Sequence, residues 1–158
     1  MRAPGLLLLA LLLGGCGFHL QGHAPLPAAV KTSYLEVPDP QTDFVQSLRH
    51  DLLANGVQLA QDRSKASAVI SVLADAVTRR VVSVSARNQP NEYEVTYTVR
   101  FSVTAPGAEL LKEQELTATA TYSFSEPLLL AKGHEEDILR ADMARDLAQR
   151  VMLLLSRL

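Results

Sequence analysis

The strongest pattern in the chain is a strict alternation of apolar and polar residues in its second half. The apolar positions of residues 93–104 are Tyr93, Val95, Tyr97, Val99, Phe101 and Val103, and polar residues separate them. The alternation returns at Leu116, Ala118, Ala120, Tyr122 and Phe124, which threonine and serine separate. A period of two predicts two β-strands, each with one buried and one polar face. Pro106-Gly107 between them predicts a type II turn.

Two other segments show the period of an amphipathic α-helix. In the first, Phe44, Val45, Leu48, Leu52 and Leu53 recur at spacings of three and four. Thr42 and Asp43 are candidate N-terminal caps, and Asn55-Gly56 predicts the C-terminal end. In residues 135–158, the apolar stripe consists of Leu139, Met143, Leu147, Val151, Leu154 and Leu158. The pattern therefore predicts one helix around Leu48 and a second at the end of the chain.

Two further segments complete the predicted sheet. Residues 34–37 form a short strand, which Pro38-Asp39-Pro40 ends because proline cannot donate to a β-ladder. Residues 68–86 predict a long strand that is twisted or bulged, because its alternation slips near Thr78-Arg79-Arg80. The order β-α-β-β-β-α predicts an α+β fold, a two-layer sandwich with two helices on one face of a mixed four-stranded sheet. The other face, rich in threonine and serine, stays uncovered.

The first residues have the layout of a bacterial signal peptide. After Arg2, an uncharged run of mostly leucine leads into Gly14-Gly15-Cys16. This run is about half of the ~20 residues that cross a bilayer, so it predicts a targeting segment rather than a permanent membrane helix. Small residues directly before a cysteine are typical of a lipobox, in which the cysteine is diacylated before the leader is cut. The alternative is an ordinary signal peptide that ends near a cysteine.

Cys16 would then be the mature N-terminus and would carry a covalent diacylglycerol and an N-acyl chain. We divide the chain into a signal peptide (residues 1–15), a lipidated N-terminus and tether (16–31) and a single α+β domain (32–158). Cys16 is the only cysteine, so the domain has no disulfide and its core must stabilise it. Gly17 stands where aspartate would signal retention in the inner membrane, which favours the outer membrane.

No group of residues in the sequence predicts catalysis or metal binding. The histidines lie in separate contexts without metal-ligand spacing, at His19, His23, His50 and His134. The close carboxylates, Glu113 with Glu115 and residues 135–137, fit solvated positions on a strand and in the first turn of a helix. The net charge of −2 provides no basic surface for nucleic acid. We expect a protein that is not an enzyme, has no metal or other cofactor and binds no nucleic acid.

Two cations allow both a structural and a functional interpretation. Arg87 lies between the two longest predicted strands, and Lys132 follows the apolar run of residues 128–131. Arg87 could be a solvated turn residue, and Lys132 a charge above core leucines. Both could instead bind phosphate, since a guanidinium offers a planar fork of donors and an ammonium a compact charge. Their spacing alone leaves both interpretations open.

Short motifs in a fixed order give the chain a family resemblance. They are Cys16-Gly17-Phe18-His19-Leu20, Leu53-Ala54-Asn55-Gly56-Val57, Arg87-Asn88 before Glu92-Tyr93, and Leu130-Ala131-Lys132 after Pro127. Together with the predicted element order, they resemble the lipopolysaccharide-assembly lipoprotein family, LptE, over essentially the whole chain. The resemblance implies a lipid-anchored outer-membrane protein that faces the periplasm, sits as a plug inside the LptD β-barrel and helps insert lipopolysaccharide into the outer leaflet. It also implies that Arg87 and Lys132 bind lipopolysaccharide.

Two rival functions stay open beside this resemblance. One is a binding lipoprotein of a different envelope machine, such as a secretin or a barrel-assembly complex. The other is a periplasm-facing hydrolase, which would need a catalytic pair that the sequence does not display. A copurified partner would identify the first.

Overall fold

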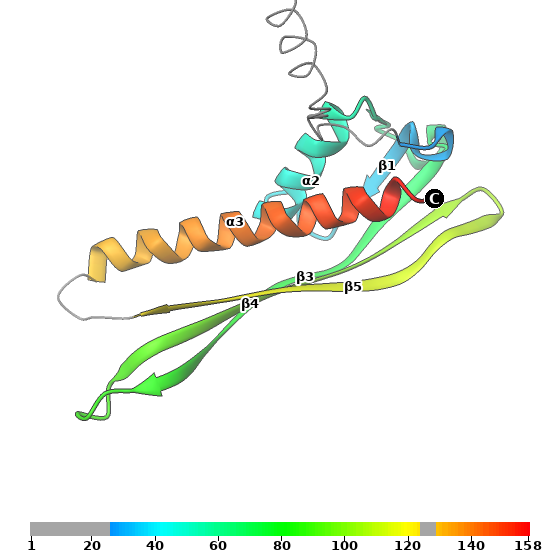
Figure 1. Ribbon diagram of the computed structural model, residues 1–158. Helices are drawn as coiled ribbons and strands as arrows, with labels where there is room; N and C mark the ends of the chain where they lie inside the picture. Colours follow the sequence, from blue (N-terminus) through cyan, green and yellow to red (C-terminus); the bar gives the residue numbers. More distant parts are fainter. Residues whose placement is uncertain (1–25, 124–128) are drawn as a thin grey trace, which may run out of the picture.

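The fold consists of a β-sheet with two helices beside it (Figure 1). The computed structural model describes residues 26–123 and 129–158, with the backbone alone for residues 129–134. The strands are β1 (Thr32–Glu36), β2 (Gln58–Leu59), β3 (Ala68–Val84), β4 (Pro90–Ala105) and β5 (Ala108–Ser123). The helices are α2 (Asp43–Ala54) and α3 (Leu129–Leu155), with 3-10 turns η2 (Ala28–Val30) and η3 (Arg63–Lys65).

All described strands belong to one mixed sheet in the order β2-β1-β3-β4-β5. β1 runs parallel to β2 and to β3, whereas β3, β4 and β5 are joined as antiparallel neighbours. The predicted α+β class is confirmed, but the predicted sheet of four strands is wrong, because the described sheet has five. The added strand, β2, is only two residues long and too short to show an alternating pattern.

Burial in β4 and β5 follows the alternation that the sequence predicted. Tyr97, Val99 and Phe101 are at most 2% exposed. Their partners in β5 are Ala118, Leu116 and Gln114, and opposite residues of paired strands point to the same face. Ala105 pairs with Ala108 across the turn, where Gly107 has the φ of +77° that the third position of a type II turn requires.

The ladder between β3 and β4 is regular where the sequence predicted a bulge. Thr78, Arg79 and Arg80 keep consecutive partners in β4, whereas the register shifts after Val72 and again between Val81 and Val84. The strand is therefore bulged as the sequence allowed, but the bulges lie on either side of Thr78-Arg79-Arg80 and not at it. Exposure explains the irregular pattern instead, since every residue from Ala76 to Val82 is exposed and the strand needs no buried face there.

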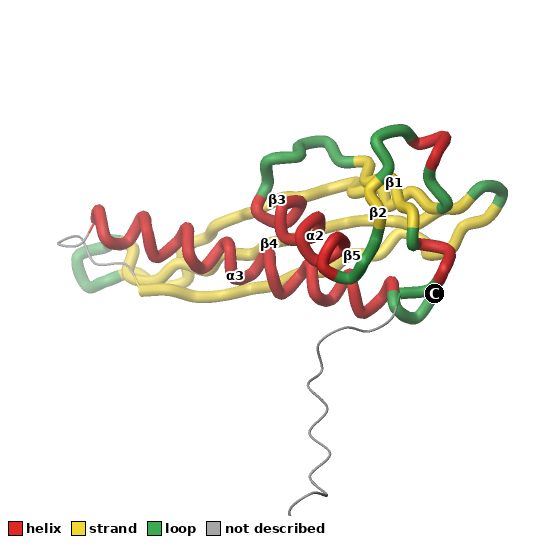
Figure 2. Tube along the Cα trace, turned by 90° about the horizontal axis from the view of Figure 1, so that it is seen from above, coloured by secondary structure: helices red, strands yellow, loops and turns green. Residues whose placement is uncertain are grey.

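Both helices pack on the same face of the sheet, as Figure 2 shows from above. The buried residues of α2 are Phe44, Val45, Leu48 and Leu52, whereas Leu53, predicted to join them, is 53% exposed. The buried residues of α3 are Met143, Ala144, Leu147, Ala148, Val151 and Leu155. α3 runs from Leu129 to Leu155 and not over the predicted residues 135–158. The core lies between these helices and the inner face of β3, β4 and β5.

Polar groups at the start of α2 join the helix to the sheet. The predicted cap is confirmed: the Thr42 hydroxyl accepts a hydrogen bond from the backbone N–H of Val45 and donates one to Asp75 on β3. The backbone N–H of Phe44 donates to the Tyr97 hydroxyl over 3.3 Å. Burial, followed by a hydrogen bond to Asp75, raises the pKa of Tyr97. These contacts satisfy N–H groups that a helix start leaves unpaired.

The packed domain includes residues that the sequence assigned to the tether. Val30 is fully buried, and its carbonyl accepts a 2.8 Å hydrogen bond from Ser33. Leu26 also packs against the core. The fold therefore begins before the predicted residue 32, while the signal peptide and Cys16 lie outside the described residues. Neither described helix is both long enough and apolar enough to cross a membrane.

Candidate functional site

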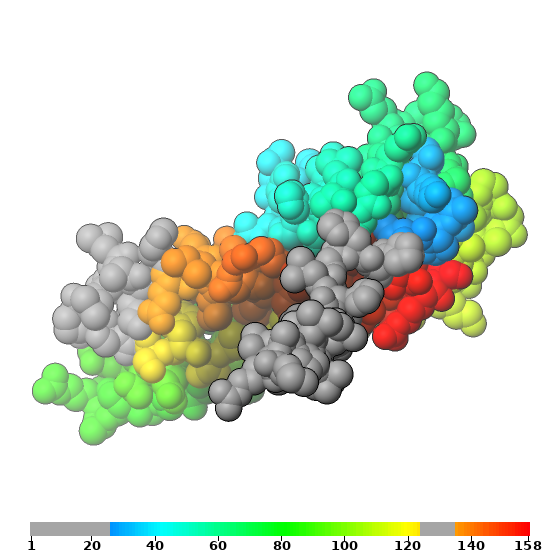
Figure 3. Space-filling model, turned by 45° about the horizontal axis from the view of Figure 1, so that its top comes forward, coloured from blue at the N-terminus to red at the C-terminus, as the bar shows by residue number. Residues whose placement is uncertain are grey.

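The structure places the segments that carry the two candidate cations at the same end of the molecule. Arg87 lies in the turn between β3 and β4, and Lys132 lies in the first turn of α3. Figures 1 and 2 show this turn and the start of α3 at one end, with the C-terminus at the other. In Figure 3 the hairpin of β3 and β4 (green) projects past the first part of α3 (orange). The side chain of Lys132 lies outside the described residues, and the binding role of both cations stays a prediction.

Backbone hydrogen bonds hold Arg87 at the apex of its turn. The N–H of Ser85 donates to the carbonyl of Gln89 over 2.7 Å, and the N–H of Asn88 donates to the carbonyl of Ser85 over 2.9 Å. Asn88 has a φ of 60°, a conformation that asparagine tolerates better than most residues. Arg87 is exposed and forms no ion pair or side-chain hydrogen bond with a described residue. Its guanidinium is therefore available to an anion.

A polar and aromatic cluster fixes the start of α3 above the sheet at this end. Glu136 of α3 accepts hydrogen bonds from Arg79 of β3 over 2.8 Å and from the Tyr122 hydroxyl of β5 over 2.6 Å. The Arg79 guanidinium lies 4.8 Å from the centre of the Tyr93 ring, which stacks on Tyr122. Since Glu136 follows Lys132 by one helical turn, this cluster sets where the first turns of α3 lie.

Sequence reasoning missed this cluster. It treated the carboxylates of residues 135–137 as solvated and Arg79 as part of a bulge. The register pairs Arg79 with Val95, so Arg79 stands on the helix-covered face of the sheet. The available signal was a charged residue at an inward position of the strand, where the covering helix can offer an anionic partner, although Arg79 keeps half of its side chain exposed.

Replacing Glu136 by glutamine should destabilise the domain by about 1 kcal/mol at neutral pH, because the charged acceptor for Tyr122 and Arg79 is lost. The hydrogen bond from Tyr122, followed by the contacts with Arg79, lowers the pKa of Glu136 below its usual value. A lowered pKa contributes stability above the unfolded-state pKa and loses it as the pH falls through the folded-state pKa. Urea unfolding should therefore separate the two proteins at neutral pH, and the difference should shrink at acid pH.

Glu113→Gln is the matched control, because Glu113 pairs with Arg100 in the open, at 51% side-chain exposure. It should change stability little at either pH. A Glu136→Gln protein as stable as the native chain at neutral pH would contradict the prediction.

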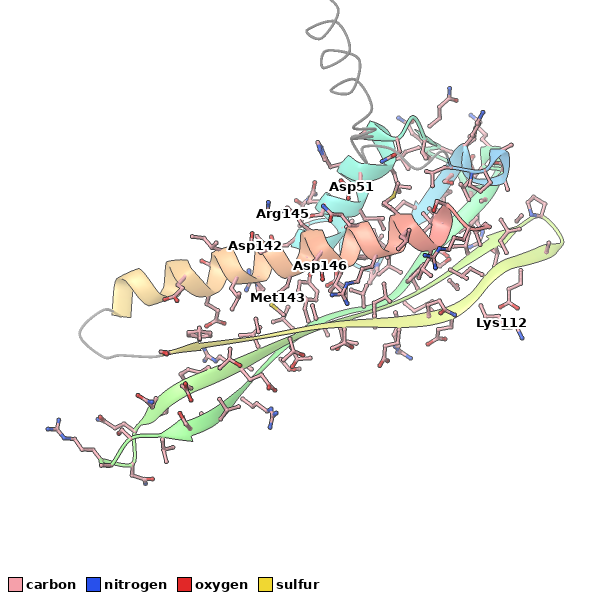
Figure 4. All side chains as sticks on the ribbon, in the orientation of Figure 1. Asp51, Lys112, Asp142, Met143, Arg145 and Asp146 are labelled. Carbon is pink, nitrogen blue, oxygen red and sulfur yellow. The ribbon has the colours of Figure 1, made fainter. Side chains whose placement is uncertain are left out.

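Charged residues on the outer surface of α3 form ion pairs with one another. Figure 4 shows Asp142 and Arg145 on the side of α3 away from the sheet, with Met143 turned toward the sheet. Arg145 forms an ion pair with Asp142, and Arg150 pairs with Asp146 over 2.6 Å. A shallow groove of about 280 Å³ between α2 and α3 is lined by Gln46, Ser47, His50, Asp51, Arg145 and Gln149. No described cluster of histidines and carboxylates has the make-up of a metal site.

Comparisons with known proteins agree with this fold. Residues 30–155 match the family model described as "LptE: Lipopolysaccharide-assembly". An LPS-assembly lipoprotein LptE of Pectobacterium atrosepticum is 31% identical over 147 residues, which cover 92% of this chain and 79% of that protein. A crystal structure of a minor lipoprotein from Acinetobacter baumannii is similar with a TM-score of 0.69 at 27% identity, covering 83% of this chain and 94% of that one. A solution structure of lipoprotein B from Nitrosomonas europaea gives a TM-score of 0.70 at 27% identity, covering 86% and 88%.

Proposed function

Because this chain belongs to the lipopolysaccharide-assembly family LptE, we propose that it is an outer-membrane lipoprotein that plugs the LptD β-barrel and helps insert lipopolysaccharide into the outer leaflet. In this role the protein binds and positions, and it catalyses no reaction. The lipid on Cys16 brings it to the membrane, and packing inside the barrel holds it there.

The observation that carries the proposal is that helices cover only one face of the sheet. Both helices lie on one face (Figure 2), and threonines alternate along β4 and β5 on the other. Thr98 and Thr117 approach within 3.4 Å on that face, beside the ion pair of Arg100 with Glu113. The lumen of an outer-membrane barrel is polar, so such a face suits a plug. A membrane-facing or dry protein interface would favour an apolar face instead.

A chain that lacks residues 1–16 but is exported by another signal should still copurify with a large outer-membrane barrel. Enclosed interfaces bury well over the ~1,200–2,000 Å² of ordinary complexes, so dissociation should be slow even without the anchor. Purification from native membranes without heating, followed by identification of the partner, measures this. Recovery of a free periplasmic monomer would contradict the plug model. Recovery of a secretin or a barrel-assembly complex would favour a different envelope machine.

Replacing Arg87 and Lys132 together by aspartate should weaken lipopolysaccharide binding by the leaderless chain about tenfold or more. Charge-assisted contacts with phosphate contribute ~1.5–3 kcal/mol each, and solvent around an exposed side chain reduces that value. Binding would be measured with purified lipopolysaccharide, and circular dichroism would check the fold. In the control, aspartate replaces two other exposed cations, Lys112 (labelled in Figure 4) and Arg157 beside the C-terminus, which lie away from the end that carries Arg87. Equal affinity of both double variants would leave Arg87 and Lys132 as solvated charges.

A further inference from the structure

The outer edge of β3 is open over most of its length. β1 pairs with residues Ala68 to Ser71 only, and no other described strand lies beside β3 on that side. β1 ends at Glu36, and the start of α2 then contacts Asp75 through Thr42. No described strand therefore pairs with this edge from Ala76 to Val84, a stretch that includes the register shift after Val81. This stretch forms one side of the long β3–β4 hairpin in Figure 1.

Aliphatic side chains are concentrated on this strand. The exposed large hydrophobic residues of β3 are Leu73 (47%), Val77 (38%), Val81 (45%), Val82 (40%) and Val84 (58%). Single exposed aliphatic residues are ordinary on protein surfaces. A row of them along an unpaired edge is different, because free N–H and C=O groups beside apolar side chains are a template for another strand.

The polar residues that normally protect such an edge are bound to the neighbouring elements. Arg79 reaches Glu136 of α3 and lies over Tyr93 of β4. Arg80 donates through its Nε atom to Glu94 of β4, and Ser83 donates to Glu92 over 2.8 Å. These side chains are thus directed across the sheet, and valines remain along the open side.

The charge at the centre of the edge argues against a second copy of this chain. Arg80 is the middle residue of the stretch from Ala76 to Val84. Antiparallel pairing of this stretch with itself would place Arg80 opposite the Arg80 of the other copy, and like charges in that position are destabilising. The Arg80 side chain stays 71% exposed beside Glu94, so its remaining guanidinium donors can bind a second carboxylate.

We propose that the free edge of β3, residues 76–84, takes up an extended segment of a partner protein as an additional strand. The segment has aliphatic side chains at alternating positions, which contact the exposed valines, and a carboxylate opposite Arg80. Backbone pairing supplies affinity in this mode of recognition, and the side-chain pockets supply selectivity. The inference rests on the proposed function in one respect, since the partner is the protein that holds the chain at the membrane. Acyl chains of a lipid fit the valines less well, because they cannot pair with the free N–H and C=O groups.

Hydrogen exchange on the native complex tests the pairing directly. The amides of residues 76–84 should exchange at least about tenfold more slowly in the complex than in the free chain, because edge amides become hydrogen-bonded. The amides of η3 are the internal control and should not change. Exchange is also measured for the free chain at high concentration and for the free chain mixed with lipopolysaccharide. Protection by either alone would overturn the proposal in favour of a second copy or of a lipid.

Matched variants test the chemistry of the edge. Arg80→Ala should reduce partner retention about tenfold, whereas Arg63→Ala, which removes a comparable exposed ion pair with Glu36, should leave it unchanged. Val82→Lys with Val84→Lys should reduce retention in the same way. Leu153→Lys, at a residue 50% exposed on α3, should not. Circular dichroism of each free variant checks that the fold persists.

The failures of the two proposals are distinguishable. A partner that is retained fully by both edge variants, with unprotected edge amides, overturns the added strand and leaves the proposed function intact. A native chain that brings no membrane partner overturns the proposed function, and the added strand with it.

Discussion

Replacing Phe101 by alanine should lower the free energy of unfolding by about 3–5 kcal/mol, a large part of the ~5–15 kcal/mol that stabilises a typical domain. Phe101 is fully buried on the helix-covered face of β4, where it pairs with Val72 of β3 and Gln114 of β5. Truncation removes the buried ring and leaves a cavity between the sheet and the helices. Urea unfolding of the leaderless chain, followed by circular dichroism, measures the loss.

Leu153→Ala provides the comparison, because Leu153 is 50% exposed on α3. Its effect should stay within about 0.5 kcal/mol, as is usual for surface positions. If both variants unfolded at the same urea concentration, the assignment of the core to this face would be wrong.

Replacing Cys16 by serine should abolish incorporation of fatty acid, because Cys16 is the only cysteine and the hydroxyl of serine cannot replace the thiol that is diacylated. When cells are grown with a labelled fatty acid, the native chain should carry the label and the variant should carry none. The unprocessed variant should also keep its leader and migrate as the larger species.

Gly17→Asp is the control for this experiment. It should keep the lipid label, because the thiol is intact, and shift the protein toward the inner membrane. Equal label in the native chain and in Cys16→Ser would refute the anchor. Export without label in either would favour an ordinary signal peptide.

Alternation made β4 and β5 predictable because their two faces have opposite surroundings. Tyr97 and Phe101 face the helices, while Thr98 and Thr117 face away from them. The period of two therefore follows directly from burial. β2 could not be found in this way, since two residues cannot display a period. The apolar stripe that predicted α3 begins at Leu139 and so gave no start before residue 135, yet the helix begins at Leu129 and continues through Gly133, a poor helix former.

The contacts of the polar cluster around Glu136 could not be predicted from local sequence patterns. Arg79 and Glu136 are separated by 57 positions in the sequence, and their pairing depends on how α3 crosses the sheet. Periodicity reports which face of an element is covered, but not which residue of the covering element lies above it. Arg87 was found because it lies at a turn and within a family motif, whereas no local pattern could predict that its guanidinium has no partner among the described residues.

The length of α3 sets a scale for the whole molecule. Its 27 residues correspond to about 40 Å of helix, close to the ~40–45 Å of a complete bilayer with its headgroups. The first described residues, η2, lie beside the C-terminal end of α3, whereas Arg87 lies past its beginning (Figures 1 and 2). η2 and the turn that carries Arg87 therefore lie at opposite ends of the described domain. Because β3 and β4 carry Arg87, the length of these strands sets how far it stands from η2, and removing two residues from each strand would bring it about 7 Å nearer.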